Sequence, residues 1–569
     1  MRDLETANKS FRFYLWMILG LAFVLRLAGI GYGLPYIYHQ DEPILVNHAM
    51  ALGVSGPNPH FFVIPSFSIY FLFSLYAACF AIGKIVHFFH NVNDFALLFL
   101  QDPSLFYFLG RFFLGAFFGT LTVGITAKLG KALFSPKTGI MAALLLAISP
   151  LHVEQSHYLY ADVPLTLAAV CLFYRLFFVL REPSYKNYLL MGAVFGLGTG
   201  MKYTMVYFLP AVLITHILAF KKEFASLEGF SKALTAASAS LLTYFAVAPY
   251  TFLDWVHFQS QIIRQSGAEL PVGIFHHLVY SLIEGTSPVL FAFFLGGALF
   301  LMRRSKREAW VFIPVILFYY GINAGFSQHS ARYMLPLVPL LCVLAALGWE
   351  VFESRLKKIP FFSNMAFLFL FVSLILPSAY LDLLFLKKDT RTECLEWVHK
   401  NIPEGSAIAM DNRFYGPHLV QTKEEILKKY QFLGSEEGDI ARKSRLDLMV
   451  QVAEHQKTYR VYTLSQTDEN GEHPFLFQRP FVKMDLEALK ETGIEYLIFN
   501  YSEHNFDAYE FRRSITKELE KVMFFSPYKD PSQKIPFDPY AATAATHLRK
   551  DLLSRVSFGP YLEVYRLKK

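Results

Sequence analysis

The sequence predicts a polytopic α-helical membrane protein with a water-soluble α/β domain at its carboxyl end. Of its 569 residues, 54% are hydrophobic and only 17% are charged, whereas a typical soluble domain is about a quarter charged. The apolar residues gather in long blocks within 11–380, and residues 381–569 have the mixed composition of a soluble domain. We therefore expect a transmembrane domain over 1–380 and a soluble domain over 381–569.

The apolar blocks have the length of membrane spans. A bilayer core of about 30 Å requires about 20 apolar residues in a helix, and the sequence predicts about 11 such spans. The first runs from Phe11 to Ile30, and its short polar leader lacks a signal-peptidase pattern, so we expect a retained first helix. The other expected spans are 106–127, 138–152, 163–180, 188–201, 203–220, 233–250, 287–302, 309–326, 333–348 and 361–380.

Basic residues in short loops predict the orientation. Cytoplasmic loops are rich in Lys and Arg, so the net charge of +7 indicates topology and not a nucleic-acid partner. We expect a cytoplasmic N-terminus, an extracytoplasmic soluble domain, and an integral protein of a bacterial inner (plasma) membrane. The basic residues of this pattern are Arg2, Lys9, Arg12, Lys128, Lys131, Lys137, Arg181, Lys186, Lys221, Lys222, Arg303, Arg304, Lys306, Arg307, Arg355, Lys357 and Lys358.

Three segments depart from regular spans. The block from Phe67 to Phe89 is apolar enough to cross, but counting it would place the later basic loops outside, so we favour an interfacial or re-entrant helix on the outer side. The span 188–201 is short and rich in glycine, which is compatible with a partial helix. Residues 249–264 read as a turn and a second interfacial helix.

The predicted topology places four polar segments on the outer side. They are residues 39–42, residues 154–162, Lys202, and residues 328–332. The topology was derived from charge and hydropathy alone, so this convergence predicts an outer-face active site.

Acidic residues in the first two segments are candidates for acid–base chemistry. Asp41 and Glu42 follow the first span, and a carboxylate there can remove a proton from an attacking acceptor. We assign the base to Asp41 and a supporting role to Glu42; the alternative is a solvated pair. Asp162 precedes an apolar run, where an N-cap is the alternative. His152 and His157 are five residues apart, which does not favour a metal pair.

Two cations are candidates for binding a phosphate. Lys202 lies between two apolar segments, where ionisable residues are costly and usually functional. Arg332 lies before another span and can bind phosphate with two nitrogens. Snorkelling toward the interface is the alternative for Lys202, and equally for Arg26 and Arg111.

In their order these features resemble the GT-C glycosyltransferases, of the protein O-mannosyltransferase and aminoarabinose transferase (ArnT-like) type. The resemblance covers about residues 1–415 and rests on an outer carboxyl-terminal domain and four motifs. These motifs are Asp41–Glu42, the Ser156–His157 to Asp162-x-Pro164 loop, the glycine-rich turn at Lys202, and the run from Arg332 to Pro339.

The resemblance implies an inverting transfer of a sugar from a polyprenyl-phosphate donor in the membrane lipid. It implies that Asp41 is the base, that Asp162 assists, and that Lys202 and Arg332 contact the phosphate. We place His39, His157, Tyr333 and Arg111 as supporting residues. No cofactor or essential metal is implied, although a divalent metal stays an open alternative. No trefoil-like repeat follows residue 380, so the acceptor is left open among a glycolipid, a glycan and a protein.

Two other classes of function compete with this interpretation. A lipid-linked sugar flippase or secondary transporter would use buried charges as gates, and inverted repeats would favour it. A membrane-anchored assembly or sensory protein would leave the polar outer segments without a role. In the soluble part we expect a helix over 390–400 and strands over 407–410, 495–499 and 562–567, and a domain that binds the acceptor or covers the site.

Overall fold

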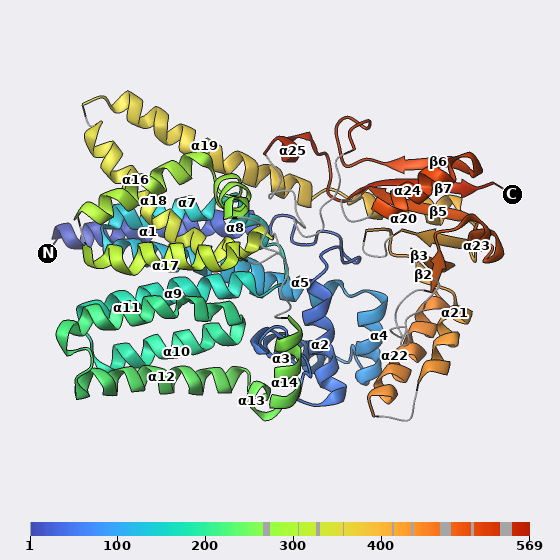
Figure 1. The fold of residues 1–569 in the computed structure, drawn as a ribbon, viewed down its shortest axis with the longest axis horizontal. Coiled ribbons are helices and arrows are strands. Elements are labelled where there is room, and N and C mark those ends of the chain that lie inside the picture. Colours follow the sequence, from blue (N-terminus) through green and yellow to red (C-terminus); the bar gives the residue numbers. More distant parts are fainter. Residues whose placement is uncertain are drawn as a thin grey trace.

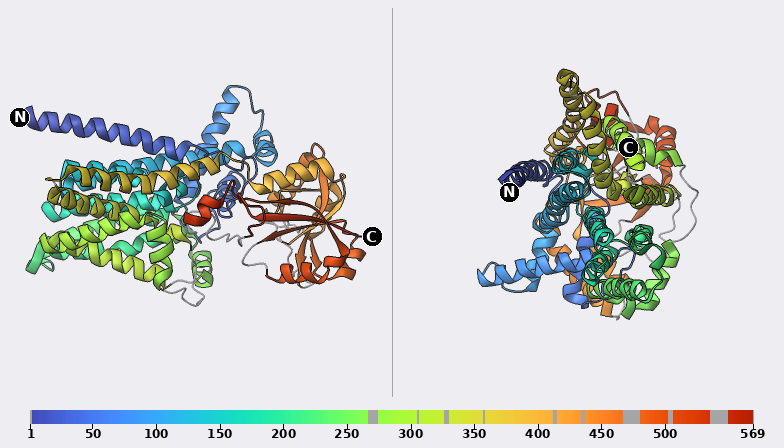
Figure 2. Two further views of the ribbon diagram at one scale, coloured as in Figure 1. Left: turned by 90° about the horizontal axis from the view of Figure 1, so that it is seen from above. Right: turned by 90° about the vertical axis from the view of Figure 1, so that its left-hand side faces the viewer.

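The computed structural model describes residues 2–265, 274–304, 306–325, 330–356, 358–411, 415–433, 437–466, 480–501, 506–534 and 549–568. The molecule is elongated, with a helical bundle at one end and an α/β domain at the other (Figures 1 and 2). The N-terminus lies at the far end of the bundle, and the C-terminus at the far end of the α/β domain. The predicted fold class, a polytopic helical membrane protein with a soluble α/β domain, is confirmed.

Each expected span coincides with helix in the described residues. Their basic connections lie at the N-terminal end of the bundle, away from the α/β domain (Figure 1). Lys357 lies outside the described residues. The helices of the bundle are α1 (Arg2–Leu27), the continuous α5 (Ser104–Gly110), η1 (Arg111–Phe117) and α6 (Phe118–Leu133), α7 (Pro136–Ala147), α9 (Asp162–Arg181), α10 (Tyr185–Met201), α11 (Leu209–Phe220), α12 (Leu227–Val247), α16 (Pro288–Arg304), α17 (Lys306–Ala324), α18 (Val338–Arg355) and α19 (Pro360–Phe385).

By their length and apolar composition, fewer helices qualify as membrane spans than the number predicted from the sequence. Seven helices in the described part are long and apolar enough to cross a bilayer, or eight if the bent pair η4 (His277–Glu284) and α16 is one span. The short α7 falls below this length because its helix breaks near Ile148, before α8 (Pro150–Gln155). The number of about 11 therefore stays a prediction.

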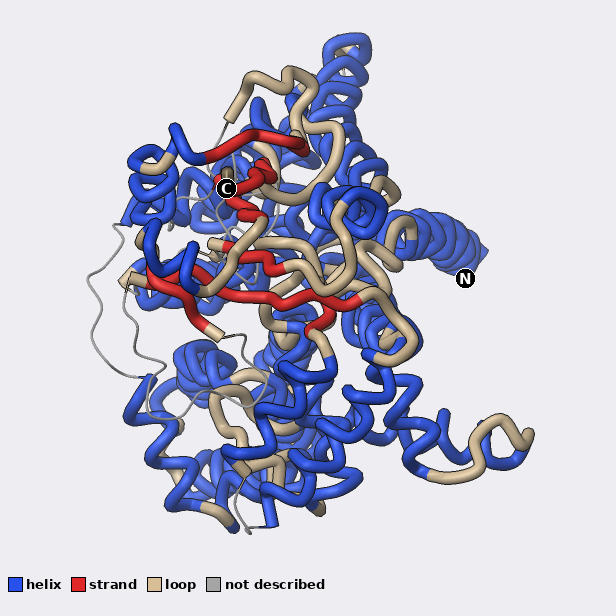
Figure 3. The backbone as a smooth tube through the Cα atoms, turned by 90° about the vertical axis from the view of Figure 1, so that its right-hand side faces the viewer, coloured by secondary structure: helices blue, strands red, loops and turns tan. Residues whose placement is uncertain are grey.

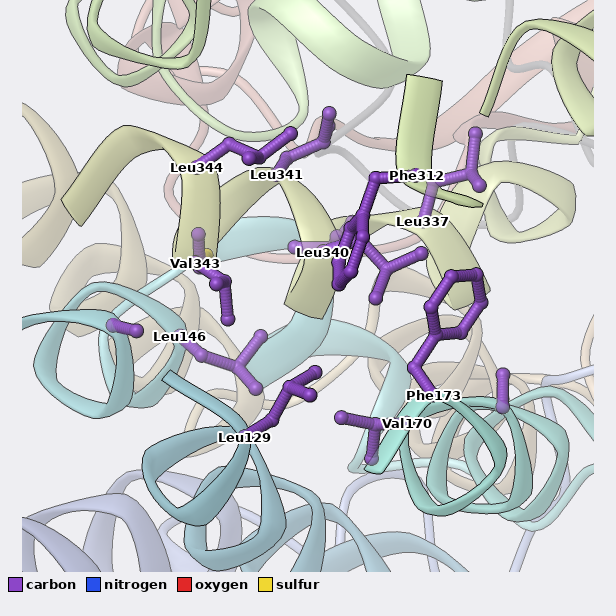
Figure 4. Packing of buried hydrophobic residues seen from close by; sticks show 14 of the residues in the cluster. Leu129, Leu146, Val170, Phe173, Phe312, Leu337, Leu340, Leu341, Val343 and Leu344 are labelled. Carbon is purple, nitrogen blue, oxygen red and sulfur yellow. The ribbon is translucent and has the colours of Figure 1, made fainter. Parts of the chain in front are cut away.

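The centre of the bundle is α18. Its residues from Val338 to Trp349 are all buried, because the helix is apolar on every side and other helices surround it. Leu340 and Leu344 of α18 pack in one cluster with Leu146 of α7 and Phe173 of α9 (Figure 4).

The glycines of α10 do not interrupt the helix, which runs unbroken for 17 residues. They are close-packing sites: a Cβ on Gly192 would lie 2.1 Å from the carbonyl oxygen of Ala236 in α12, and one on Gly196 would lie 2.1 Å from that of Ser240. Small residues four apart allow membrane helices to approach closely. The glycines are therefore packing sites, and at 17 residues α10 stays shorter than the helices that are long enough to cross a bilayer.

At the end of the bundle that meets the α/β domain, a group of helices runs roughly across the direction of the bundle helices. Figure 1 shows α3 (Phe67–Ile85) nearly end-on, and Figure 2 shows it extending sideways from the bundle. This placement fits the interfacial position favoured for this block, although its composition also suits a span. The neighbouring helices are α2 (Glu42–Ser55), α4 (Val92–Gln101), α13 (Tyr250–Leu253) and α14 (Trp255–Gln265).

The soluble domain is built on a seven-stranded sheet in the order β2-β3-β1-β5-β7-β6, with β4 paired to β3. Strands β1 to β5 run parallel to one another, whereas β7 runs antiparallel to both β5 and β6. Their bounds are β1 (Ala407–Met410), β2 (Val420–Gln421), β3 (Thr458–Ser465), β4 (Phe481–Lys483), β5 (Tyr496–Tyr501), β6 (Leu519–Phe525) and β7 (Tyr561–Leu567).

Both faces of the sheet are covered (Figure 3). Leu395 and Val398 of α20 pack on one face, and Leu489 of α23 and Ala508 of α24 pack on the other. Parallel strands require such cover because both of their faces are apolar. The helices are α20 (Thr390–Asn401), α21 (Lys423–Lys428), α22 (Glu437–Ala453), α23 (Leu486–Glu491), α24 (Phe506–Ser514) and α25 (Arg549–Ser554).

Candidate active site

Residues 37–42 lie between the bundle and the α/β domain. The Gln40 amide donates to the Tyr415 hydroxyl at 2.8 Å, and a His418 ring nitrogen lies 3.1 Å from the carbonyl oxygen of Ile37. This contact places the residues around Asp41 at the bundle end that meets the soluble domain.

Four predicted site residues form one chain of ion pairs there. Arg332 Nη1 donates to Asp41 Oδ2 at 2.5 Å, and Lys202 Nζ donates to Asp162 Oδ1 at 2.6 Å. Arg332 Nε lies 3.7 Å from Asp162 Oδ2, which joins the two pairs. The four residues come from four separate segments of the chain, so only the folded bundle brings them together.

Local structure places each side chain of this cluster. Asp41 is the N-cap of α2 but makes no capping hydrogen bond, so its carboxylate is available to Arg332. Asp162 is the first residue of α9, with Ala161 in the N-cap position, and pairs with Lys202, so the N-cap alternative is wrong. Lys202 is the extended residue between α10 and η2 (Tyr203–Phe208), and Arg332 lies in η5 (Ala331–Leu337).

Two tyrosine rings flank the cations. The Arg332 guanidinium carbon lies 4.6 Å from the centroid of the Tyr160 ring, and the Lys202 ammonium lies 5.1 Å from that of Tyr333. Aromatic faces attract cations and exclude water. Tyr333, one of the predicted supporting residues, is therefore part of the cluster, while Tyr160 is a neighbour that the sequence analysis did not select.

Burial and charge act in opposite directions on the Asp41 carboxyl. Burial favours its neutral form, but the adjacent Arg332 guanidinium and its hydrogen bond hold the Asp41 pKa below the ordinary value. Burial lowers the pKa of Lys202, and the attraction of Asp162 offsets only part of that effect. Asp41 is thus a carboxylate at neutral pH, ready to accept a proton.

The cluster also contains unsatisfied polar atoms. Asp162 Oδ2 and Arg332 Nε are buried and have no hydrogen-bond partner. Unmade hydrogen bonds of charged groups are costly, and such groups commonly mark a functional site. An incoming polar ligand would supply the missing partner of Arg332.

Glu42 lies beside Asp41 but points elsewhere. Its two carboxylate oxygens accept bonds from Arg111 Nε and Nη2 at 2.7 Å each, and the Leu159 backbone N–H donates to Oε1 at 2.9 Å. Both side chains are buried, and Arg111 also donates to the carbonyl oxygens of Ile30 and Tyr32. Snorkelling of Arg111 is therefore wrong: the pair ties the first outer segment to the bundle.

The two predicted supporting histidines hold the loops around the cluster. The Asp41 backbone N–H donates to His39 Nδ1 at 3.3 Å, and burial lowers the His39 pKa. His157 lies between the carbonyl oxygens of Val153 and Ala28, and its ring stacks on Phe385 with centroids 4.3 Å apart. Neither histidine ring is hydrogen-bonded to the Asp162–Lys202 pair.

A different side-chain group has the spacing of a metal site. His60, Asp254 and His257 have ligand atoms within 4.8 Å of one another, near the start of α14. Asp254 already accepts hydrogen bonds from Asn58 and pairs with His257 at 2.6 Å. His152 is not part of this group, and its Nδ1 lies 2.9 Å from Arg26 Nη2. Arg26 is buried in the bundle and does not snorkel.

The start of the soluble domain holds residues 32–38, which follow α1. Arg391 pairs with Asp389 at 2.7 Å and stacks over the Tyr38 ring at 3.9 Å, and Tyr32 donates to Asp389. The Tyr38 hydroxyl lies 2.7 Å from Thr392 Oγ1. The sequence did not predict these contacts, because no local pattern links residues 32–38 with residues 389–392. Residues 328 and 329 of the polar segment 328–332 lie outside the described residues.

Comparison with known proteins agrees with the overall fold. The family model of dolichyl-phosphate-mannose-protein mannosyltransferases matches residues 108–250. A crystal structure of ArnT from Cupriavidus metallidurans bound to undecaprenyl phosphate is 11% identical with a TM-score of 0.51, covering 90% of this chain and 95% of that one. Its apo structure gives 12%, 0.51, 91% and 96%. No curated protein matches. The chain thus has the fold of the ArnT structure over about nine tenths of its length, and residues 108–250 match the mannosyltransferase family model.

Proposed function

We propose that this chain transfers a sugar from a polyprenyl-phosphate donor to an acceptor on the extracytoplasmic face of a bacterial inner membrane. The observation that carries the proposal is the chain of ion pairs Asp41–Arg332–Asp162–Lys202 at the end of the bundle. It combines a carboxylate that can act as base with two cations that can bind a phosphate. The ArnT structure with the same fold holds undecaprenyl phosphate, a ligand of this class.

The charges of the cluster support a phosphate ligand. Two cations and two carboxylates balance in the free site, so a donor phosphate must compete with the carboxylates for the cations. We propose that Arg332 turns from Asp41 to the phosphate and that Lys202 provides a second charge-assisted contact. Because Asp41 then loses the neighbour that lowers its pKa, it becomes a stronger base when the donor is bound.

The reaction follows from these positions. The acceptor O–H or N–H attacks the anomeric carbon of the sugar from the face opposite the phosphate, so the configuration is inverted. Its proton passes to Asp41, and the electrons of the breaking carbon–oxygen bond go to the phosphate. Arg332 and Lys202 stabilise that developing charge. The donor supplies both energy and leaving group, so we propose that no cofactor or metal is required.

An apolar groove supports a lipid-linked donor. It has a volume of about 420 Å³ and lies between α3 and α12–α13, lined by Phe67, Tyr70, Phe71, Val247 and Tyr250 among others. Val247 also packs against Gly200, two residues before Lys202. We propose that the polyprenyl chain lies in this groove, with its phosphate beside Lys202.

The test is transfer from a radiolabelled polyprenyl-phosphate sugar in proteoliposomes containing the full chain. Release of label from the carrier would support the reaction class. An equal rate of release with and without a chelator such as EDTA would support transfer without a metal. If no carrier sugar is consumed but labelled lipid changes leaflet, the flippase alternative replaces this proposal.

A further inference from the structure

Three side chains that can bind a metal meet on the outer loops of the bundle and share no residue with the chain of ion pairs. His60 comes from the loop between α2 and α3, Asp254 follows α13, and His257 lies in the first turn of α14. Their ligand atoms all lie within 4.8 Å of one another. We call these three residues the outer histidine cluster.

The distances in the cluster suit a small transition-metal ion. His60 Nδ1 lies 3.4 Å from Asp254 Oδ2, which is longer than an ordinary N–H···O hydrogen bond. Ligands held at about 2.0–2.1 Å around a tetrahedral zinc ion are about 3.3 Å apart, so these two atoms already have the required separation. His257 Nδ1 lies 2.6 Å from Asp254 Oδ1, and its ring has to move outward by about 0.7 Å to bind the same ion.

The cluster is open to the outer solution. The side chains of His60 and His257 are 60% and 64% exposed, and that of Asp254 is 15% exposed. The two imidazoles therefore have room to move, and an ion can reach them from the water. Within the described part of the chain the His60 ring makes no hydrogen bond, so a hydrogen-bond network alone does not explain its position beside Asp254.

The backbone of His60 is held by the helix that carries His257. Gln261, one turn later in α14, donates from Nε2 to the His60 carbonyl oxygen at 3.0 Å and accepts the Phe62 N–H at Oε1 at 2.7 Å. These bonds hold His60 at a φ of 48°, a conformation that is uncommon for residues other than glycine. Such backbone conformations gather at functional positions.

Asn58 orients the carboxylate of the cluster. Its Nδ2 donates to Asp254 Oδ2 at 2.8 Å, and its Oδ1 accepts the His60 backbone N–H at 3.0 Å. Carboxylates that bind metals are commonly held by an outer hydrogen bond of this kind. One side chain therefore fixes the positions of two of the three possible ligands.

The donor atoms select the class of ion. Two imidazole nitrogens and one carboxylate oxygen suit zinc and neighbouring transition metals, whereas magnesium and calcium prefer ligands that are all oxygen. Three protein ligands leave a fourth tetrahedral position for water. The set with two neutral imidazoles carries one negative charge, which favours a divalent cation.

The cluster borders the apolar groove. Pro57, at the start of the loop that carries His60, lines the groove together with Tyr250 of α13. Near the other end of this loop, the Phe62 carbonyl oxygen accepts a hydrogen bond from the Tyr203 hydroxyl at 3.0 Å, and Tyr203 directly follows Lys202. An ion that joins the loop to α14 would therefore fix one wall of the groove.

We propose that His60, Asp254 and His257 bind one divalent transition-metal ion of the zinc class, and that this ion holds residues 57–62 against α14 at the edge of the apolar groove. Its role is structural, because none of its ligands belongs to the proposed base or to the phosphate-binding cations. The metal site does not depend on the proposed transferase function; its effect on the lipid-linked donor does.

Isothermal titration with zinc chloride tests the site, using the full chain without an affinity tag, freed of metal by EDTA and placed in lipid nanodiscs. Wild type should bind one zinc ion more than His257→Gln, whose amide can still donate to Asp254 but is a poor ligand for zinc. His60→Gln should lose the same ion, and magnesium chloride should show no difference between these proteins. His455→Gln is the matched control, because His455 is exposed in the soluble domain. Equal zinc binding by wild type and His257→Gln, or an equal loss in the control, would overturn the proposal.

Hydrogen exchange of the same samples tests the structural role. Zinc should slow the exchange of the backbone N–H groups of residues 58–62 in wild type but not in His257→Gln. In EDTA the two proteins should exchange alike, which shows that the variant is folded. Equal exchange of wild type with and without zinc would overturn the role of the ion in holding this loop.

Transfer assays connect the ion with the donor. EDTA should raise the KM of wild type for a long-chain donor at least threefold, while the rate of release at saturating donor stays the same. His257→Gln should have the raised KM with or without EDTA. An unchanged KM would overturn the link to the groove, and a lower rate at saturating donor would overturn the structural role. If no sample transfers sugar, the proposed function fails, and the zinc titration still decides the metal site.

Discussion

The buried pair of Glu42 and Arg111 gives a prediction that separates positioning from catalysis. Replacing Glu42 by Gln keeps the shape of the side chain but leaves the Arg111 guanidinium buried without a counter-charge. Both side chains are at most 1% exposed, and two hydrogen bonds of 2.7 Å join them. Removing one partner of such a pair costs about 3–5 kcal/mol.

The same structure sets the controls. Lys388 and Glu396 also form a pair at 2.7 Å, but both are more than half exposed. Exposed pairs contribute about 0–1 kcal/mol, so Glu396→Gln should leave stability nearly unchanged. In Glu42→Gln/Arg111→Gln no uncompensated charge remains, so the double variant should lose less stability than the sum of the two single variants.

Denaturant titration of the protein in mixed micelles measures these differences as free energies of unfolding. We expect Glu42→Gln to lose several kcal/mol and to transfer sugar at reduced rate because Asp41 is misplaced. A Glu42→Gln variant with wild-type stability and no transfer would refute the reasoning and make Glu42 a group that takes part in the chemistry.

Three further predictions concern the donor site. Wild-type kcat/KM should stay level as the pH falls to about 4, because the depressed pKa of Asp41 lies below the ordinary value of 3.8. In Arg332→Gln, the fall of kcat/KM at acid pH should begin at a higher pH. An unchanged pH profile would contradict the pairing of Arg332 with Asp41. Lys202→Ala should lower kcat/KM for the donor by about 10- to 100-fold through loss of a charged hydrogen bond of about 1.5–3 kcal/mol, with Lys388→Ala as the control. Ala246→Trp should fill part of the apolar groove and raise KM about tenfold for a long-chain donor but little for a short-chain one; equal effects on both would place the lipid elsewhere.

The sequence predicted the features that depend on residues close together along the chain. Apolar blocks predicted the order of the helices, and the alternating segments after residue 381 predicted α20, β1, β5 and β7. Polar residues beside the predicted spans led to Asp41, Asp162 and Arg332, and Lys202 was selected because it lies between two apolar segments. The structure brings these four residues into one cluster.

Other features depend on contacts between distant segments. The glycines of α10 looked like a weak helix because their role is the approach of α12, which sequence order does not reveal. The pairing of Glu42 with Arg111 and the clamp of Arg391 on Tyr38 join segments far apart along the chain. The domain boundary was placed at 380, but α19 continues to Phe385, where it packs against Tyr32.

The central claim is that Asp41 is the base of a transfer from a lipid-linked sugar. The most direct measurement is release of radiolabel from a polyprenyl-phosphate sugar in proteoliposomes, comparing wild type, Asp41→Asn and the exposed control Glu396→Gln at equal protein content. General base catalysis contributes about 10²- to 10⁴-fold, so Asp41→Asn should lose at least a hundredfold while Glu396→Gln transfers like wild type. Full activity of folded Asp41→Asn would contradict the account.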